Sequence, residues 1–147
     1  MRSGTESTLL IASMAAAAKW GMDHQKAELE RLTQLRDYAV ERLKEVVPQV
    51  EFISKEDTCP HILAVSLPGY KSEVVVRFLS DRGVYISSGS ACHKGKLSHV
   101  YTALGLPKPW LTGALRISFG PGSTREDVDA LAQGLLEAKA MLFTTLS

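Results

Sequence analysis

The stretch Ala114-Leu-Arg-Ile-Ser-Phe119 carries the clearest strand pattern in this sequence of 147 residues. Successive side chains of a strand point to opposite faces of a sheet, so this stretch has one apolar and one polar face. The apolar face consists of Leu115, Ile117 and Phe119, and the polar face of Arg116 and Ser118. A strand with one buried and one solvated face is typical of an antiparallel sheet.

A turn and a helix follow this strand directly. Gly120-Pro-Gly-Ser123 is rich in turn-forming residues, and Thr124 and Asp127 have the spacing of a capping box. We therefore expect a last helix that runs from this box to about Phe143. Its apolar residues recur at helical spacing: Val128, Leu131, Leu135, Ala138 and Leu142.

Two helices are predicted near the start of the chain. The first covers residues 8–20, is rich in alanine and ends at Gly21. It is apolar almost all round, which requires burial on more than one side, in the middle of a fold or against a partner. Asp23 is expected to cap a second helix over residues 24–47, which Pro48 ends.

The middle of the chain is predicted to form shorter elements. We expect strands at 50–53 and 61–67, a helix at 72–82 that Gly83 ends, strand character at 84–86, a brief helix from Ser98 to Gly105 and a stiff connection at 107–110. Helices with one apolar stripe and strands with one apolar face predict an α+β fold. We expect a small, mainly antiparallel sheet with helices on one face, in a single domain over residues 1–147.

Composition excludes several classes of protein. The hydrophobic share is 45%, the charged share is 22% and the formal net charge is +1, which predicts no bulk attraction to nucleic acid or to an anionic membrane. Two cysteines, Cys59 and Cys92, are too few for a disulfide framework. No apolar run approaches the length of a membrane span. We expect a soluble, cytoplasmic protein.

Cys92 lies in a polar stretch that bases follow. Small residues precede it in Ser87-Ser-Gly-Ser-Ala-Cys92, and His93, Lys94 and Lys96 come after it. A free cysteine is most often a small buried hydrophobe. Neighbouring positive charge, however, favours the thiolate, which is the form that attacks. Our hypothesis is that Cys92 is a nucleophile.

Other candidate residues each have a plain structural interpretation. Arg116 on a polar strand face is ordinarily a solvated side chain. Thr5 could do no more than cap the first helix. Cys92, His93 and His99 do not have the four-ligand spacing of structural zinc, so we predict no metal site.

Several motifs together resemble the C-terminal part of a cysteine desulfurase of the NifS/IscS type, in the class-V aminotransferase family. They are Ser87-Ser-Gly-Ser-Ala-Cys92, Ser98-His-Val-Tyr-Thr-Ala-Leu-Gly-Leu106, Ala114-Leu-Arg-Ile-Ser-Phe-Gly120 and the start of the last helix at Thr124. The resemblance implies the small C-terminal domain of a fold-type I enzyme that uses pyridoxal 5'-phosphate. It also implies a homodimer in which the first helix meets the large domain and the second subunit.

The resemblance assigns a role to each candidate residue. Cys92 would take sulfur from L-cysteine as a persulfide and leave L-alanine, Arg116 would hold the substrate carboxylate, and Thr5 would reach the cofactor phosphate. The persulfide would pass to an acceptor protein for iron–sulfur cluster assembly or thiolation. A guanidinium fork matches a carboxylate, so lysine should replace Arg116 poorly.

The sequence also departs from the family. The lysine of the Schiff base belongs to a large domain that this chain does not resemble, so we expect an excised C-terminal domain that is inactive alone. The segment from Cys92 to Ser98 is slightly shorter than usual in the family, and Ala64 stands where asparagine is common.

Two other functions remain open at this point. One is another class-V enzyme, such as a selenocysteine lyase, which should tolerate Cys92→Ser. The other is a standalone sulfur carrier with a persulfide on Cys92 and no cofactor.

Overall fold

The computed structural model describes residues 4, 6–55, 58–89 and 99–144. Its elements in chain order are α1 (Thr8–Val46), β1 (Glu51–Phe52), β2 (Ile62–Ser66), α2 (Ser72–Ser80), β3 (Ser87–Ser88), α3 (His99–Ala103), α4 (Lys108–Thr112), β4 (Ala114–Ser118) and α5 (Arg125–Met141). The chain divides into two compact units, residues 1–31 and residues 32–147. The second unit contains the sheet.

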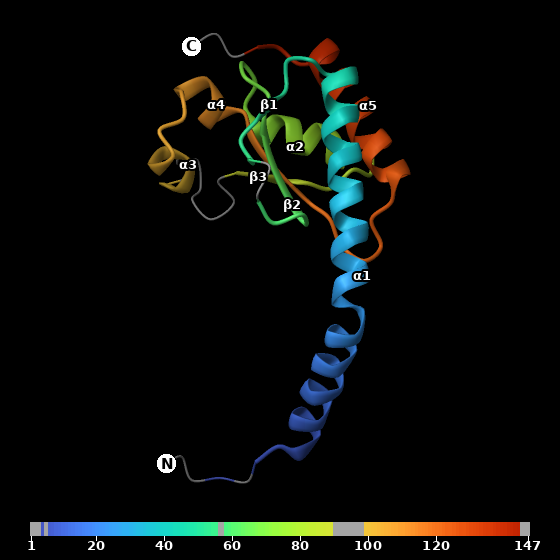
Figure 1. Ribbon diagram of the computed structural model, residues 1–147. Helices are drawn as coiled ribbons and strands as arrows, with labels where there is room; N and C mark the ends of the chain where they lie inside the picture. The colour runs from blue at the N-terminus through green and yellow to red at the C-terminus, as the bar shows by residue number, and fades with distance from the viewer. Residues whose placement is uncertain (1–3, 5, 56–57, 90–98, 145–147) are drawn as a thin grey trace. The chain divides into compact units, whose positions relative to one another are not determined.

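The strand predicted from the alternating pattern is β4, in the interior of the sheet. The sheet has four strands in the order β1-β2-β4-β3, and neighbouring strands are antiparallel (Figure 1). β2 pairs with all of β4, and on the other side Ser87 of β3 pairs with Arg116 and Ser88 with Leu115. β4 therefore has a neighbour on both sides.

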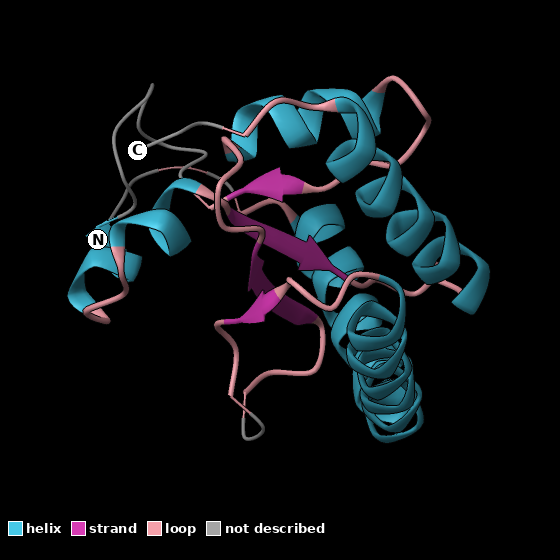
Figure 2. Ribbon diagram, turned by 90° about the horizontal axis from the view of Figure 1, so that it is seen from above, coloured by secondary structure: helices cyan, strands magenta, loops and turns pink. Residues whose placement is uncertain are grey.

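One face of the sheet forms the core. Residues that pair across antiparallel strands share a face, so Leu63 and Ile117 lie beside Val65 and Leu115. All four are buried, and helices α2 and α5 and the part of α1 from Leu32 onward cover them (Figure 2). The prediction of an α+β fold with an antiparallel sheet is confirmed.

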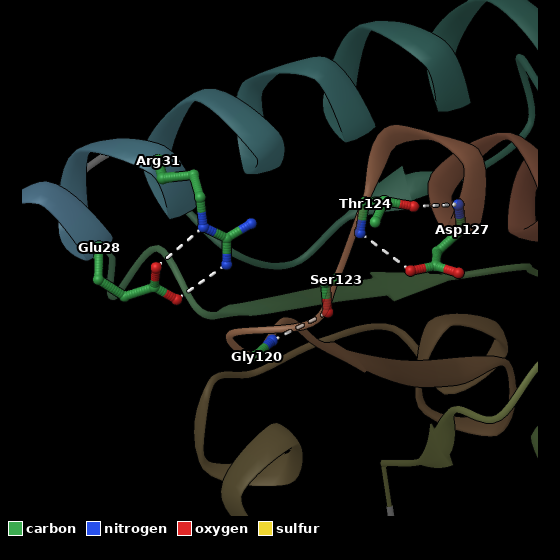
Figure 3. A network of polar contacts seen from close by, with 6 residues as sticks. All are labelled: Glu28, Arg31, Gly120, Ser123, Thr124 and Asp127. Carbon is green, nitrogen blue, oxygen red and sulfur yellow. Dashed lines mark hydrogen bonds and ion pairs between the residues drawn. The ribbon is translucent and has the colours of Figure 1, made fainter.

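The start of α5 is held by the predicted capping box. The Thr124 side-chain oxygen accepts a hydrogen bond from the Asp127 backbone N–H at 3.3 Å, and the Asp127 carboxylate accepts one from the Thr124 N–H at 2.9 Å (Figure 3). In the preceding turn, the Gly120 N–H donates to the Ser123 hydroxyl oxygen at 2.9 Å. The two bonds between Thr124 and Asp127 satisfy N–H groups that a helix start leaves without partners, and the Gly120 bond closes the turn before it.

Close contacts fix α5 against its neighbours. A Cβ added at Gly134 would lie 2.6 Å from Leu79 Cδ2, so glycine lets α2 approach α5 closely. On the α1 side, Tyr38 Oη and Arg42 Nε both donate to Asp129 Oδ1, at 2.9 and 2.7 Å. These hydrogen bonds lower the pKa of Asp129.

The two helices predicted before residue 48 are one helix in the structure. α1 continues through Gly21 and Asp23, which were predicted to end the first helix and cap the second. Glycine inside a helix costs only about 1 kcal/mol relative to alanine, and the favourable residues on both sides outweigh this cost. The predicted end before Pro48 is confirmed within one residue.

Two smaller predictions need correction. Residues 84–86 precede β3 and are not assigned to a strand. The stiff connection at 107–110 contains the start of α4, because proline suits the first turn of a helix. Within α2, Val74 is 46% exposed, whereas Val75 and Leu79 are buried.

Within residues 1–31, the helix exposes large apolar side chains. Leu9, Met14 and Met22 are 75%, 76% and 80% exposed. The sequence pattern predicts that these side chains are buried in a fold or against a partner. In this unit they are exposed. In the described part of the chain, no helix is long and apolar enough to cross a membrane.

Candidate carboxylate-binding site at Arg116

Arg116 lies on the face of β4 that points away from the core. Its antiparallel partners on the two neighbouring strands are Ala64 in β2 and Ser87 in β3, and paired residues share a face. Both partners have small side chains. The guanidinium of Arg116 therefore rises from a row of small residues on the exposed face of an interior strand.

The guanidinium of Arg116 is available to an anion. Among the described residues, no hydrogen bond or ion pair engages it. By contrast, Arg42 binds Asp129 at 2.7 Å and Arg82 binds Glu137 at 3.0 Å. A planar guanidinium on an interior strand, with no acceptor in the described ranges, suits bidentate binding of a carboxylate.

The next row on the same face is covered by backbone and by α4. In this row Ser66 pairs with Ala114, and the Ser66 hydroxyl donates to the Trp110 carbonyl oxygen at 2.8 Å. A Cβ at Gly113 would lie 2.2 Å from the carbonyl oxygen of Leu67, so only glycine fits this approach. These contacts close one end of this face, whereas in the next row the Arg116 side chain is exposed.

Tyr101 of α3 lies beside this closed row. The Gly89 N–H donates to the Ala114 carbonyl oxygen at 2.9 Å, which brings Gly89 alongside Ala114. A Cβ added at Gly89 would lie 2.2 Å from Tyr101 Cε2 and 3.0 Å from Ala114 Cβ. The Tyr101 ring therefore occupies the space that a side chain at position 89 would need.

The electrostatics of Tyr101 and Arg116 are coupled. Burial raises the pKa of the Tyr101 phenol, and the positive charge of Arg116 opposes that rise. The phenol is therefore neutral and able to donate a hydrogen bond at ordinary pH. Sequence reasoning missed Tyr101, because its position depends on the pairing of Gly89 with Ala114. Gly89, within the stretch from Ser87 to Cys92, was the available signal.

Two predicted site residues, Cys92 and Thr5, lie outside the described residues, and so does His93. Cys59 is a separate, exposed thiol, with its Sγ 3.1 Å from His61 Nδ1. No group of three or more potential metal ligands occurs among the described histidines, cysteines and carboxylates.

A cavity of about 260 Å³ lies between the start of α5 and the chain before β3. Its lining includes Val84, Ile86, Phe119 and Leu131. Arg116 and Tyr101 are not part of that lining, which also includes Ser118 and Asp127, so this cavity is distinct from the row that contains Arg116.

Comparison with known families decides where this arrangement belongs. Residues 1–131 match the family described as aminotransferase class-V. The chain belongs to the class-V aminotransferase family. The predicted resemblance is thereby confirmed at the level of the family.

Relatives within this family are named for desulfurase activity. A "NifS/IcsS protein homolog" from Lactobacillus delbrueckii subsp. bulgaricus is 35% identical over 137 residues, which cover 88% of this chain and 34% of that protein. "Cysteine desulfurase IscS" from Clostridium botulinum is 31% identical over 139 residues, 91% of this chain and 35% of that protein. The chain thus spans about a third of the length of these relatives.

Solved structures agree with the fold. A "NIFS-LIKE PROTEIN" has a TM-score of 0.80 at 26% identity and covers 96% of this chain and 36% of that structure. The NifS-like protein from Rickettsia africae, at 23% identity and a TM-score of 0.79, shows the same fold; the match covers 95% of this chain and 37% of that one.

Proposed function

We propose that this chain is the substrate-binding and sulfur-accepting part of a cysteine desulfurase that depends on pyridoxal 5'-phosphate. The observation that carries the proposal is the exposed Arg116 on β4, whose guanidinium has no hydrogen-bond or ion-pair partner among the described residues. Family membership and the desulfurase names of its relatives support the same reaction. L-cysteine is the proposed substrate.

Arg116 would fix the substrate by its carboxylate. The two oxygens of a carboxylate match two parallel N–H groups of a guanidinium, which sets both the position and the orientation of the amino acid. The residues on either side, Ala64 and Ser87, have small side chains, which would favour the approach of the substrate. The Cα atom and the thiol of L-cysteine would then point away from the sheet.

Cys92 is the proposed sulfur acceptor. Gly89 is held to β4, and Cys92 follows it by three residues, so the covalent chain limits their Cα separation to about 11 Å. The Cys92 thiolate would attack the sulfur of L-cysteine. A persulfide bond forms as the substrate carbon–sulfur bond breaks, and its electron pair goes to the carbon, which takes up a proton. L-alanine then leaves.

The residues around Arg116 do not complete a cofactor site by themselves. Ala64, Ser87 and Tyr101 have no amine for a Schiff base. Bound pyridoxal phosphate supplies an electron sink for negative charge on the substrate. We therefore assign the cofactor to a large domain, with Thr5 of this chain reaching toward its phosphate, and we expect the 147 residues alone to be inactive.

The exposed apolar side chains of residues 8–31 support a partner for this chain, namely the large domain and a second subunit of a homodimer. A protein that accepts the persulfide sulfur is the other proposed partner. Its pathway would be iron–sulfur cluster assembly or thiolation.

The direct test is L-alanine release from L-cysteine by the natural polypeptide that carries these residues, supplied with pyridoxal phosphate. We expect alanine from the wild type and from the matched control Cys59→Ser, with a persulfide on Cys92. Cys92→Ser should release no alanine above the free-cofactor background. The same assay of residues 1–147 alone should give only that background.

Other results would select another function. Alanine that persists in Cys92→Ser would indicate a different class-V enzyme, such as a selenocysteine lyase. A wild type that releases no alanine but accepts sulfur on Cys92 from a persulfide donor would indicate a sulfur carrier.

A further inference from the structure

We propose that Tyr101 is a second substrate-binding residue, whose phenol O–H donates a hydrogen bond to the same carboxylate that Arg116 holds. This inference rests on the proposed function and adds a residue that determines substrate specificity. It follows from the place of Tyr101 on the exposed face of the sheet.

The Tyr101 ring lies close to Gly89. A Cβ at position 89 would come within 2.2 Å of Tyr101 Cε2, so the ring lies directly over the glycine. Gly89 is itself fixed by its hydrogen bond to the Ala114 carbonyl. The ring is thereby located beside the start of β4, on the face that carries Ala114 Cβ.

The Tyr101 ring lies next to the row of residues that contains Arg116. Side chains two residues apart on a strand point to the same face and are separated by about 7 Å. Ala114 and Arg116 are two residues apart on β4, and Gly89 and Ser87 are their neighbours on the β3 side. Tyr101 therefore borders the row from which the guanidinium rises.

The Tyr101 phenol keeps its proton at neutral pH. Burial of Tyr101 raises its pKa, and the charge of Arg116 reaches the phenol and lowers that pKa in part. The O–H is therefore retained at neutral pH. Within the described ranges of the chain, no hydrogen bond from it to a protein acceptor is present. A neutral donor beside a free cation is suited to an anionic ligand.

Two donors of different kinds would distinguish a carboxylate from a neutral group. The guanidinium fork takes up the carboxylate, and a short O–H···O⁻ bond from the phenol adds selectivity. An amide in place of the carboxylate has an NH₂ group on one side, which cannot accept from the phenol. Tyr101 would thus favour free amino acids over their amides.

The test uses Tyr101→Phe in the natural polypeptide, with pyridoxal phosphate present. Two quantities are measured: the KM and kcat of alanine formation, and competitive inhibition by L-alanine and by L-alaninamide. We expect Tyr101→Phe to raise the KM for L-cysteine and weaken inhibition by L-alanine by roughly tenfold, the effect of one charge-assisted hydrogen bond. Inhibition by L-alaninamide and kcat should stay unchanged.

Tyr70→Phe is the matched control. Tyr70 is buried elsewhere in the same unit, and its hydroxyl donates to the Lys139 carbonyl oxygen at 3.2 Å. Loss of that hydroxyl should leave the KM and both inhibition constants unchanged.

The outcomes separate the two proposals. An unchanged KM in Tyr101→Phe, or equal weakening of both inhibitors, would overturn the role of Tyr101 and leave the desulfurase proposal standing. A wild type that releases no alanine would overturn both.

Discussion

The two faces of β4 share one backbone but differ in burial and in the chemistry of their side chains. On the core face, Leu115 and Ile117 are 0% and 4% exposed and pack against the helices. On the other face, Arg116 is exposed and flanked by Ala64 and Ser87. The comparison teaches that one strand can supply stability on one side and a binding group on the other. Substitutions on the two sides should therefore have separable effects.

The largest difference in the free energy of unfolding is expected between the variants Leu115→Ala and Arg116→Ala. Leu115→Ala removes a fully buried side chain and should lower the free energy of unfolding by about 2–5 kcal/mol. Arg116→Ala changes an exposed side chain that has no hydrogen-bond or ion-pair partner in the described part of the chain, so its effect should stay within about 0.5 kcal/mol. Urea denaturation of the chain measures both values. Equal losses would show that the two faces are not independent.

A smaller loss of stability is expected at Gly89, whose backbone lies close to the Tyr101 ring. Gly89→Ala would place a methyl group 2.2 Å from Tyr101 Cε2, and overpacking of this kind costs about 1–3 kcal/mol. Tyr101→Ala should recover part of that cost in the double variant, because it removes the ring that collides. Denaturation of the two single variants and the double variant gives the coupling. Additive losses would place the ring elsewhere.

The N-cap of α5 should contribute still less to the free energy of unfolding. Thr124→Ala removes the side-chain oxygen that accepts from the Asp127 N–H, so the free energy of unfolding should fall by about 1 kcal/mol. Thr112→Ala is a matched control, because the Thr112 hydroxyl donates to Lys108 O inside a short exposed helix. A loss in the control as large as that in Thr124→Ala would contradict the role of the cap.

The smallest effect concerns pH. Hydrogen bonds from Tyr38 and Arg42 lower the pKa of Asp129, so its contribution to stability is present above its unfolded pKa of about 3.9 and is lost as pH falls through the lower folded value. Asp129→Asn should therefore flatten the acid limb of the stability curve. Thermal melting between about pH 5 and pH 2 would show it. An unchanged acid limb would mean that these hydrogen bonds contribute nothing in solution.

Local patterns in the sequence predicted much of the fold. The alternation over residues 114–119 fixed the faces of β4, and Thr124 with Asp127 fixed the start of α5. Both signals act within a few residues and need no knowledge of distant contacts. The prediction of a helix end at Gly21 was wrong. Glycine can end a helix but does not require an end, and α1 continues through Gly21.

The candidate site was predictable only in part. Arg116 followed from the strand pattern and from the resemblance, since its position on β4 is local. Tyr101 could not be found in this way, because its place depends on the pairing of Gly89 with Ala114 across strands. The roles of Cys92 and Thr5 stay predictions.

The central claim is that Arg116 binds the substrate carboxylate, and Arg116→Lys in the natural polypeptide tests it most directly. Lysine keeps the charge and loses the bidentate fork, so the KM for L-cysteine should rise by about 10- to 100-fold with folding intact. Inhibition by L-alanine should weaken in parallel, and inhibition by L-alaninamide should not. A KM for L-cysteine equal to that of the wild type would contradict the account.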